Sequence, residues 1–184
     1  MLKLFKSYLI LLFFLFAHLL NSQDRYITRS GIIKFDSRIE SIVPIKAVNN
    51  SVSAIFNPST RDIAVLSFIR GFNFENSLME EHFNENYAES DQYPKAFFKG
   101  TIQNFSISKS KKYFFDGLLY FHGVEKKITN LPLYVENKDN QISISGVFSL
   151  LVSDFNIKIP KIVTKKIPNK IYVELNLILN RSNK

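Results

Sequence analysis

A histidine surrounded by glutamates is the part of this chain that most resembles a metal site. His82 stands among Glu80, Glu81 and Glu85, and imidazole and carboxylate groups are common zinc ligands. His82 and Glu81 are neighbours in sequence, however, so they do not share a helix face. His122 is far away in sequence, and the chain contains no cysteine. We therefore expect no metal and no other cofactor, and we interpret the cluster as a polar helix face.

The residue patterns typical of enzymes are missing from the sequence. The paired carboxylates, such as Glu80 with Glu81 and Glu136 with Asp139, are close only in sequence and lack the desolvated setting of general acid–base chemistry. Neither a Gly-x-Ser-x-Gly elbow nor a glycine-rich phosphate loop occurs, and the six glycines stand singly. Composition alone leaves a dispersed Ser/His/Asp triad open, but we do not predict an enzyme.

Asp154 is a second polar candidate. It lies between Ser153 and Phe155, directly after an apolar stretch that is typical of a strand. An aspartate at this place commonly closes an Asx turn at a strand end. We favour that structural role over contact with a ligand, and both remain open from the sequence.

The first 23 residues have the pattern of a secretory signal peptide. Lys3 and Lys6 precede an uncharged run rich in Leu and Phe, and a polar exit follows at Asn21–Gln23. The run is short for a membrane span of about 20 residues, which makes an uncleaved anchor the less favoured alternative. We expect residues 1–23 to be removed and residues 24–184 to form one domain in the periplasm or outside the cell. Without a cysteine at the cleavage site, a lipoprotein anchor cannot form there.

The chain is basic, with 24 Lys and Arg against 16 Asp and Glu. Without Lys3 and Lys6 the net charge of +8 falls to +6. Most lysines are scattered, which favours a solvated surface over attraction to anionic head groups. A protein that is exported from the cytoplasm is not expected to bind nucleic acid.

Alternating apolar and polar residues predict an antiparallel all-β domain of eight strands. Turn-forming residues separate most of these runs, for example at Asn57–Ser59 and Asn137–Asn140. The predicted strands cover Tyr26–Phe35, Val43–Phe56, Arg61–Ile69, Ala96–Ile107, Lys112–His122, Lys126–Glu136, Ile142–Leu150 and Ile171–Leu179.

One short helix is predicted after Ser77. Ser77 and Glu80 have the spacing of a capping box, and apolar or aromatic residues follow at helical spacing up to Tyr87. Tyr93-Pro94 ends the segment, because a residue that precedes proline avoids the helical region.

The strand Lys112–His122 has apolar residues on both faces, which is unusual for a strand with a solvated side. Either the helix and long loops cover the outer face, or a bulge near Gly117 bends the strand. Both arrangements fit a barrel with an apolar interior.

Three motifs in order resemble the YceI-like family of exported lipid- and polyisoprenoid-binding proteins. They are LMEEHFNENYAESDQYPKAFFKG at Leu78–Gly100, FHGV at Phe121–Val124 and SDFNIKIPK at Ser153–Lys161. The resemblance extends from Tyr26 to Leu179. Asn156 stands where the family often has glycine, and asparagine is the residue that next best tolerates a left-handed backbone.

The resemblance implies a lipocalin-like antiparallel eight-stranded β-barrel with one short helix that covers one end. It also implies that the barrel sequesters or carries an apolar ligand, a polyisoprenoid or fatty-acyl lipid, and it places His82 and Asp154 as polar residues at the barrel end. A homodimer is left open. The predicted lining residues are Phe35, Val65, Phe98, Leu119, Phe121, Phe148 and Leu175.

Two other functions compete with a lipid carrier. If these residues fill a solid core, the protein is an envelope interaction or stress protein without a ligand. A hydrolase or isomerase of the same ligand would need a polar cluster inside the barrel, and the sequence indicates none.

Overall fold

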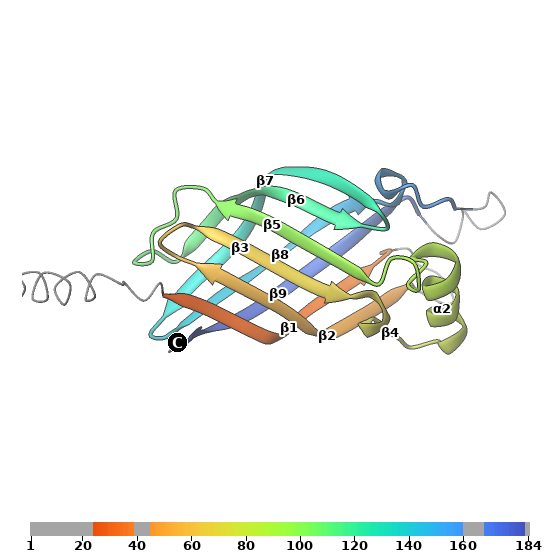
Figure 1. The fold of residues 1–184 in the computed structure, drawn as a ribbon, viewed down its shortest axis with the longest axis horizontal. Helices are drawn as coiled ribbons and strands as arrows, with labels where there is room; N and C mark the ends of the chain where they lie inside the picture. Colours follow the sequence, from red (N-terminus) through yellow and green to blue (C-terminus); the bar gives the residue numbers. More distant parts are fainter. Residues whose placement is uncertain (1–23, 39–44, 160–167, 183–184) are drawn as a thin grey trace, which may run out of the picture.

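The strands of the computed structural model follow one another around a closed antiparallel barrel (Figure 1). The structure describes residues 24–38, 45–159 and 168–182. Each long strand pairs with its neighbour in sequence, and β1 also pairs with β9, which closes the sheet. The eight long strands are β1 (Arg25–Asp36), β2 (Lys46–Asn57), β3 (Asp62–Phe68), β5 (Lys95–Ile102), β6 (Lys111–Phe121), β7 (Val124–Lys138), β8 (Gln141–Leu151) and β9 (Lys170–Ser182).

The predicted eight-stranded barrel is therefore confirmed, with strand ends that differ mostly by one to three residues. The largest difference is in β5, which ends at Ile102 instead of Ile107. Val43, the predicted start of the second strand, lies outside the described residues. The short strand β4 (Asn73–Phe74), which pairs with β2, was not predicted because two residues carry no periodic pattern.

The barrel is solid at the end that holds the β2–β3 and β7–β8 turns. Inward side chains from all eight long strands meet there, and β5 contributes Ile102 alone. Arg181 donates to both carboxylate oxygens of Asp24 at 2.7 and 2.8 Å, which raises the pKa of the guanidinium and joins the start of β1 to the end of β9. The core consists of Tyr26, Val52, Ala54, Phe56, Ile63, Ile102, Tyr113, Phe115, Leu133, Val135, Ile142, Ile144, Leu175, Leu177 and Leu179.

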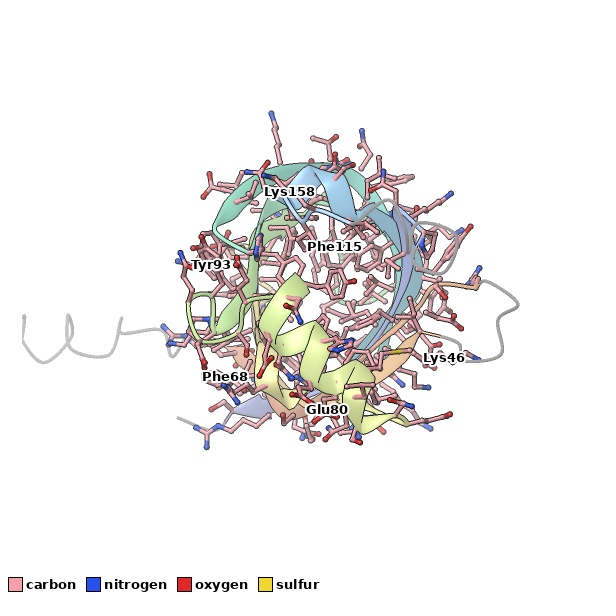
Figure 2. The ribbon with its side chains drawn as sticks, turned by 90° about the vertical axis from the view of Figure 1, so that its right-hand side faces the viewer. Lys46, Phe68, Glu80, Tyr93, Phe115 and Lys158 are labelled. Atoms are coloured by element: carbon pink, nitrogen blue, oxygen red, sulfur yellow. The ribbon has the colours of Figure 1, made fainter. Side chains whose placement is uncertain are left out.

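The helix α2 (Ser77–His82) and the π-helical turn η2 (Phe83–Tyr87) lie across the opposite end (Figure 2). The predicted cap is wrong by one residue: Asn76 is the N-cap, and its side chain accepts from the Met79 amide at 3.0 Å. Glu80 instead accepts from the Phe74 amide at 2.9 Å, which ties α2 to β4. The helical segment ends at Tyr87, six residues before Tyr93.

Neither predicted explanation accounts for the apolar residues on both faces of β6. The register shift near Gly117 places the extra residue on β7, and β6 pairs with β5 without a shift from Phe115 to Tyr120. The helix covers the barrel end and not this face, so Phe114 and Leu118 on the outside are 46% and 41% exposed. In the described part of the chain, no helix is long and apolar enough to cross a bilayer.

Candidate functional site

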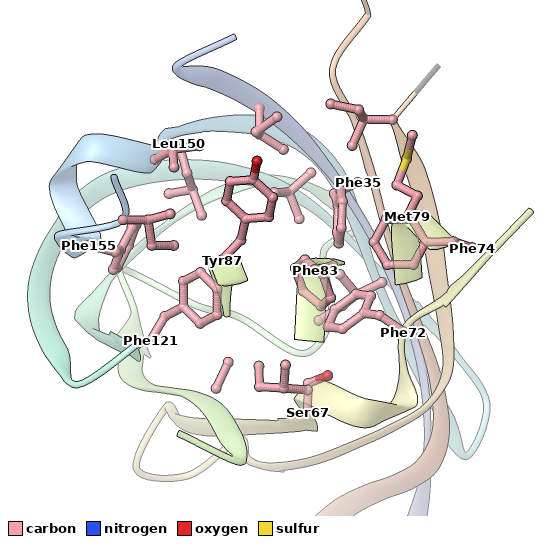
Figure 3. Close-up of a pocket in the computed structure, with 18 of the residues that line it drawn as sticks. Phe35, Ser67, Phe72, Phe74, Met79, Phe83, Tyr87, Phe121, Leu150 and Phe155 are labelled. Atoms are coloured by element: carbon pink, nitrogen blue, oxygen red, sulfur yellow. The ribbon is translucent and has the colours of Figure 1, made fainter. Parts of the chain in front are cut away.

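An apolar cavity of about 730 Å³ occupies the half of the barrel beneath α2 and η2 (Figure 3). Strands β1, β3, β4, β5, β6, β8 and β9 contribute to its wall, and Leu78, Met79, His82, Phe83 and Tyr87 from the helical segment contribute to its cover. The further lining residues are Ile33, Phe35, Ile45, Ser67, Ile69, Phe72, Phe74, Asn76, Ala96, Leu119, Phe121, Phe148, Leu150, Leu151, Val152, Phe155, Ile157, Ile171 and Val173.

Two small side chains widen the hollow half of the barrel locally. Ser67 on β3 and Ala96 on β5 are register partners, and both line the cavity. The inward positions at the solid end hold Tyr26, Phe56, Tyr113 and Phe115 together with aliphatic residues. Because packed interiors leave few voids, two adjacent small side chains leave space beside them.

Four phenylalanines form one wall of the cavity. The ring of Phe35 on β1 lies 5.3 Å from Phe72, 5.6 Å from Phe74 and 5.5 Å from Phe83, measured between ring centroids. Phe83 belongs to η2 and also contacts Phe74 at 5.1 Å. Tilted and edge-to-face pairs of this kind add to the burial energy of the rings. The cluster therefore attaches the helical cover to the barrel.

All of the predicted lining residues face the barrel interior. Phe35, Leu119, Phe121 and Phe148 line the main cavity. The remaining ones lie deeper and border a second cavity of about 430 Å³ that adjoins the core: Val65, Phe98 and Leu175. Their contact with a ligand stays a prediction.

The two polar candidates lie in different surroundings. His82 lies at the end of α2, is exposed, and contributes to the cavity lining. Asp154 is in the turn η3 (Val152–Phe155), and its carboxylate forms an ion pair with Lys126 of β7. It therefore joins η3 to β7 by this pair, in place of the predicted Asx turn. Asn156, which follows η3, has the expected left-handed backbone with φ 58°.

Sequence reasoning missed a polar junction around His122. The imidazole Nδ1 lies 2.9 Å from the Phe155 carbonyl oxygen, and Nε2 lies 2.8 Å from Glu89 Oε2. Tyr93 covers the ring edge-on at 4.7 Å. Both partners are oxygen atoms that can accept from a ring nitrogen that carries a proton. The partners are each 33 residues from His122, so no local spacing could have indicated the junction.

A second missed group is Asn49, which is fully buried on β2. Its Nδ2 donates to Ser67 Oγ at 2.9 Å and to the Phe68 carbonyl at 3.0 Å, and its Oδ1 accepts from the Ser51 amide at 2.9 Å. These bonds fix Ser67 beside the cavity. Within residues 24–38, 45–159 and 168–182, His, Asp and Glu do not gather into a group of three that could hold a metal ion.

Comparison with known proteins agrees with this architecture. The family model described as the YceI-like domain matches residues 29–179. No curated protein sequence shows a significant match to the chain.

Solved structures share the fold at low sequence identity. A polyisoprenoid binding domain from Saccharophagus degradans, implicated in plant cell wall breakdown, superposes with a TM-score of 0.73 and 12% identity, over 86% of this chain and 98% of that one. BcnA from Burkholderia cenocepacia gives 0.68 and 17%, over 80% and 94% of the two chains. The Campylobacter jejuni YCEI protein gives 0.61 and 19%, over 79% and 90%.

Proposed function

Since the chain belongs to the YceI-like family, we propose that it is an exported binding protein that encloses an apolar chain inside its barrel. The ligand class that we propose is a polyisoprenoid or a fatty-acyl lipid. We propose no catalytic step. The protein sequesters or carries its ligand.

The character of the main cavity is the observation that carries this proposal. Its volume of about 730 Å³ lies within the range of roughly 300–1,000 Å³ that is usual for small-molecule sites. Its lining is aliphatic and aromatic apart from Ser67, Asn76, His82 and the Tyr87 hydroxyl. Burial of hydrocarbon contributes about 0.8 kcal/mol per CH₂ group, so a long chain needs no polar partner to bind.

Two further observations support a long ligand over a compact one. The second cavity adjoins the main one, because Ile33, Ser67, Leu119 and Phe148 line both. The name of the Saccharophagus degradans domain describes polyisoprenoid binding by a protein of the same fold. A linear isoprenoid or acyl chain fits such an elongated space.

Native mass spectrometry of the purified protein, followed by organic extraction, tests the proposal. We expect additional mass that is released by solvent and identified as an isoprenoid or acyl lipid. Stripped protein should then take up a fluorescent fatty-acyl probe, and an extracted isoprenoid should compete for it. Stripped protein that takes up neither ligand would contradict the carrier function.

The rival function is an interaction protein of the envelope without a ligand. Exposed outer residues favour it, since Phe68, Phe114 and Leu118 are 51%, 46% and 41% exposed. The same mass spectrum distinguishes the two functions, because a co-purified protein in place of a lipid supports the rival.

A further inference from the structure

The strands β7 and β8 diverge along half of their length. Their ladder runs only from Lys138 and Gln141 at the turn to Tyr134 and Ser145. Beyond this point β7 continues to pair with β6 as far as Val124, and β8 continues to pair with β9 as far as Leu151. The barrel is therefore split between the first half of β7 and the second half of β8.

Two local features of the sequence accompany the divergence of β7 and β8. At Gly146 an added Cβ would lie 2.6 Å from Leu133 Cδ2, so the missing side chain leaves room for Leu133 at the branch point. Further along β7, Asn130 has a left-handed φ of 54°, and the register with β6 shifts next to it. Asp116 Oδ1 accepts from the Asn130 amide at 2.7 Å, which holds β7 to β6 at the bulge.

The second cavity reaches this split from the inside. Its lining includes residues 127–133 of β7 on one edge and Phe148, Ser149 and Leu150 of β8 on the other. Thr129 and Ser149 are exposed, so the cavity wall passes directly into the outer surface at these edges. Leu150 and Phe148 also line the main cavity. A path therefore leads from the main cavity to the side of the barrel. It is apolar inside and has Lys127, Thr129, Asn130 and Ser149 where it reaches the surface.

Among the described residues, side-chain contacts and one bond to a turn close the far end of the split. Lys126 of β7 forms its ion pair with Asp154 of η3, and both side chains are about one third exposed, at 34% and 28%. Next to it, His122 contacts the Phe155 carbonyl oxygen at 2.9 Å. Partly exposed ion pairs are weak, whereas opening a strand pair elsewhere in the barrel breaks a ladder of backbone hydrogen bonds.

From this geometry we infer that the split between β7 and β8 is a lateral mouth through which the apolar chain enters and leaves, with Lys126–Asp154 as its latch. The inference rests on the proposed function. The core fills one end of the barrel, and the helical cover with its phenylalanine cluster lies over the other. The side wall can open without unpairing a strand and without displacing the helical cover.

A bulky label at the split tests the route. The chain has no cysteine, so Thr129→Cys provides a single thiol that reacts after folding with a large maleimide. Labelling should slow both uptake and release of a fluorescent fatty-acyl probe severalfold in stopped-flow measurements. Lys138→Cys, exposed near the β7–β8 turn at the solid end, is the matched control and should leave both rates unchanged when labelled.

Substitutions in the latch test its role separately. Asp154→Asn should raise uptake and release rates severalfold while the equilibrium Kd changes little, because both rates pass through the same opening. The charge-swapped double variant Lys126→Asp with Asp154→Lys should return the rates toward the parent values. Glu174→Gln, which removes the Lys34–Glu174 pair between β1 and β9, is the control and should not alter exchange.

The outcomes distinguish a failure of the lateral mouth from a failure of the proposed lipid binding. If the parent binds the probe but the label at position 129 and the latch variants leave both rates unchanged, the lateral mouth is wrong and the chain passes the helical cover. If the parent binds neither the acyl probe nor an isoprenoid, the proposed function fails and the inference fails with it.

Discussion

Gly100 on β5 and Gly117 on β6 are register partners, and the ring of Phe98 lies against both of them. An added Cβ on Gly117 would stand 2.3 Å from the Lys99 carbonyl oxygen and 2.6 Å from Phe98 Cζ. The glycine pair thus provides a strip without side chains on which an aromatic ring rests. Phe98 packs against the core and borders the second cavity. By holding this ring in place, the two glycines help to determine how far the cavity extends toward the core.

We expect Gly117→Ala to destabilise the protein because backbone and ring must both move. Overpacking of this kind typically costs about 1–3 kcal/mol. Urea unfolding followed by circular dichroism measures the change in the free energy of unfolding. Thr101→Ala on the exposed face of β5 is the control, and surface substitutions usually stay within about 0.5 kcal/mol. Equal stabilities of the two variants would show that the strip is not close-packed.

Asn49→Ala should destabilise the wall that carries Ser67. The substitution leaves the Phe68 carbonyl without its side-chain donor and removes the acceptor of the Ser51 amide. A buried polar group that loses its partner typically costs about 1–3 kcal/mol. The exposed Asn73, which donates to the Gly71 carbonyl at 3.1 Å, offers the comparison Asn73→Ala, for which a small change is expected. The melting temperatures of both variants and the parent measure the difference. Equal melting temperatures for the two variants would contradict the prediction.

The strands could be predicted from the sequence because each carries its own pattern. In β9, alternate residues Leu175, Leu177 and Leu179 are all buried, as a period of two requires. The family motifs then led to a barrel with the helix at its end. The predicted lining residues face inward for the same reason, since parity along a strand decides which side chains share a face.

Contacts between distant segments could not be predicted in this way. The partners of His122 come from the loop after η2 and from η3, and the Lys126–Asp154 pair joins residues that are 28 positions apart. The split between β7 and β8 depends on where a ladder stops, which strand propensity does not reveal. The capping residue was misplaced because Asn76 and Ser77 are both good caps, and only the backbone geometry distinguishes them.

The mature protein should begin near Gln23 or Asp24 and be found outside the cytoplasm. The basic start, the apolar run and the polar exit of residues 1–23 motivate this expectation, and these residues lie outside the described part of the structure. N-terminal sequencing of protein from the periplasm or the medium measures it. Protein recovered from the membrane fraction with Met1 intact would support the uncleaved anchor instead.

Chelators should leave the melting temperature unchanged. The chain has no cysteine, and its described residues hold no group of three potential ligands, so a structural metal lacks a ligand set. Differential scanning fluorimetry with and without EDTA is sufficient. A clear drop in melting temperature with EDTA, restored by added zinc, would contradict the interpretation of the glutamates around His82.

Phe121 and Phe115 lie on the same face of β6 but in different halves of the barrel, which makes them a matched pair. Phe115 is 1% exposed within the core and only borders the second cavity, whereas Phe121 lines the main cavity and contacts Phe155 with ring centroids 5.4 Å apart. Truncation of a packed phenylalanine typically costs about 3–5 kcal/mol. Phe115→Ala should reach that range. Phe121→Ala should cost less, because one side of its ring already faces open space.

Ligand binding should be weakened more by Phe121→Ala than by Phe115→Ala. Phe121→Ala removes apolar contact from the cavity wall and should weaken uptake of a fluorescent fatty-acyl probe. Phe121→Asp should abolish it, because a carboxylate in this wall loses several kcal/mol of solvation. Lys109→Ala, in the exposed loop before β6, should change neither stability nor binding. Circular dichroism confirms that each variant is folded before probe titration. Parent-like affinity of folded Phe121→Ala would mean that the ligand does not contact this part of β6.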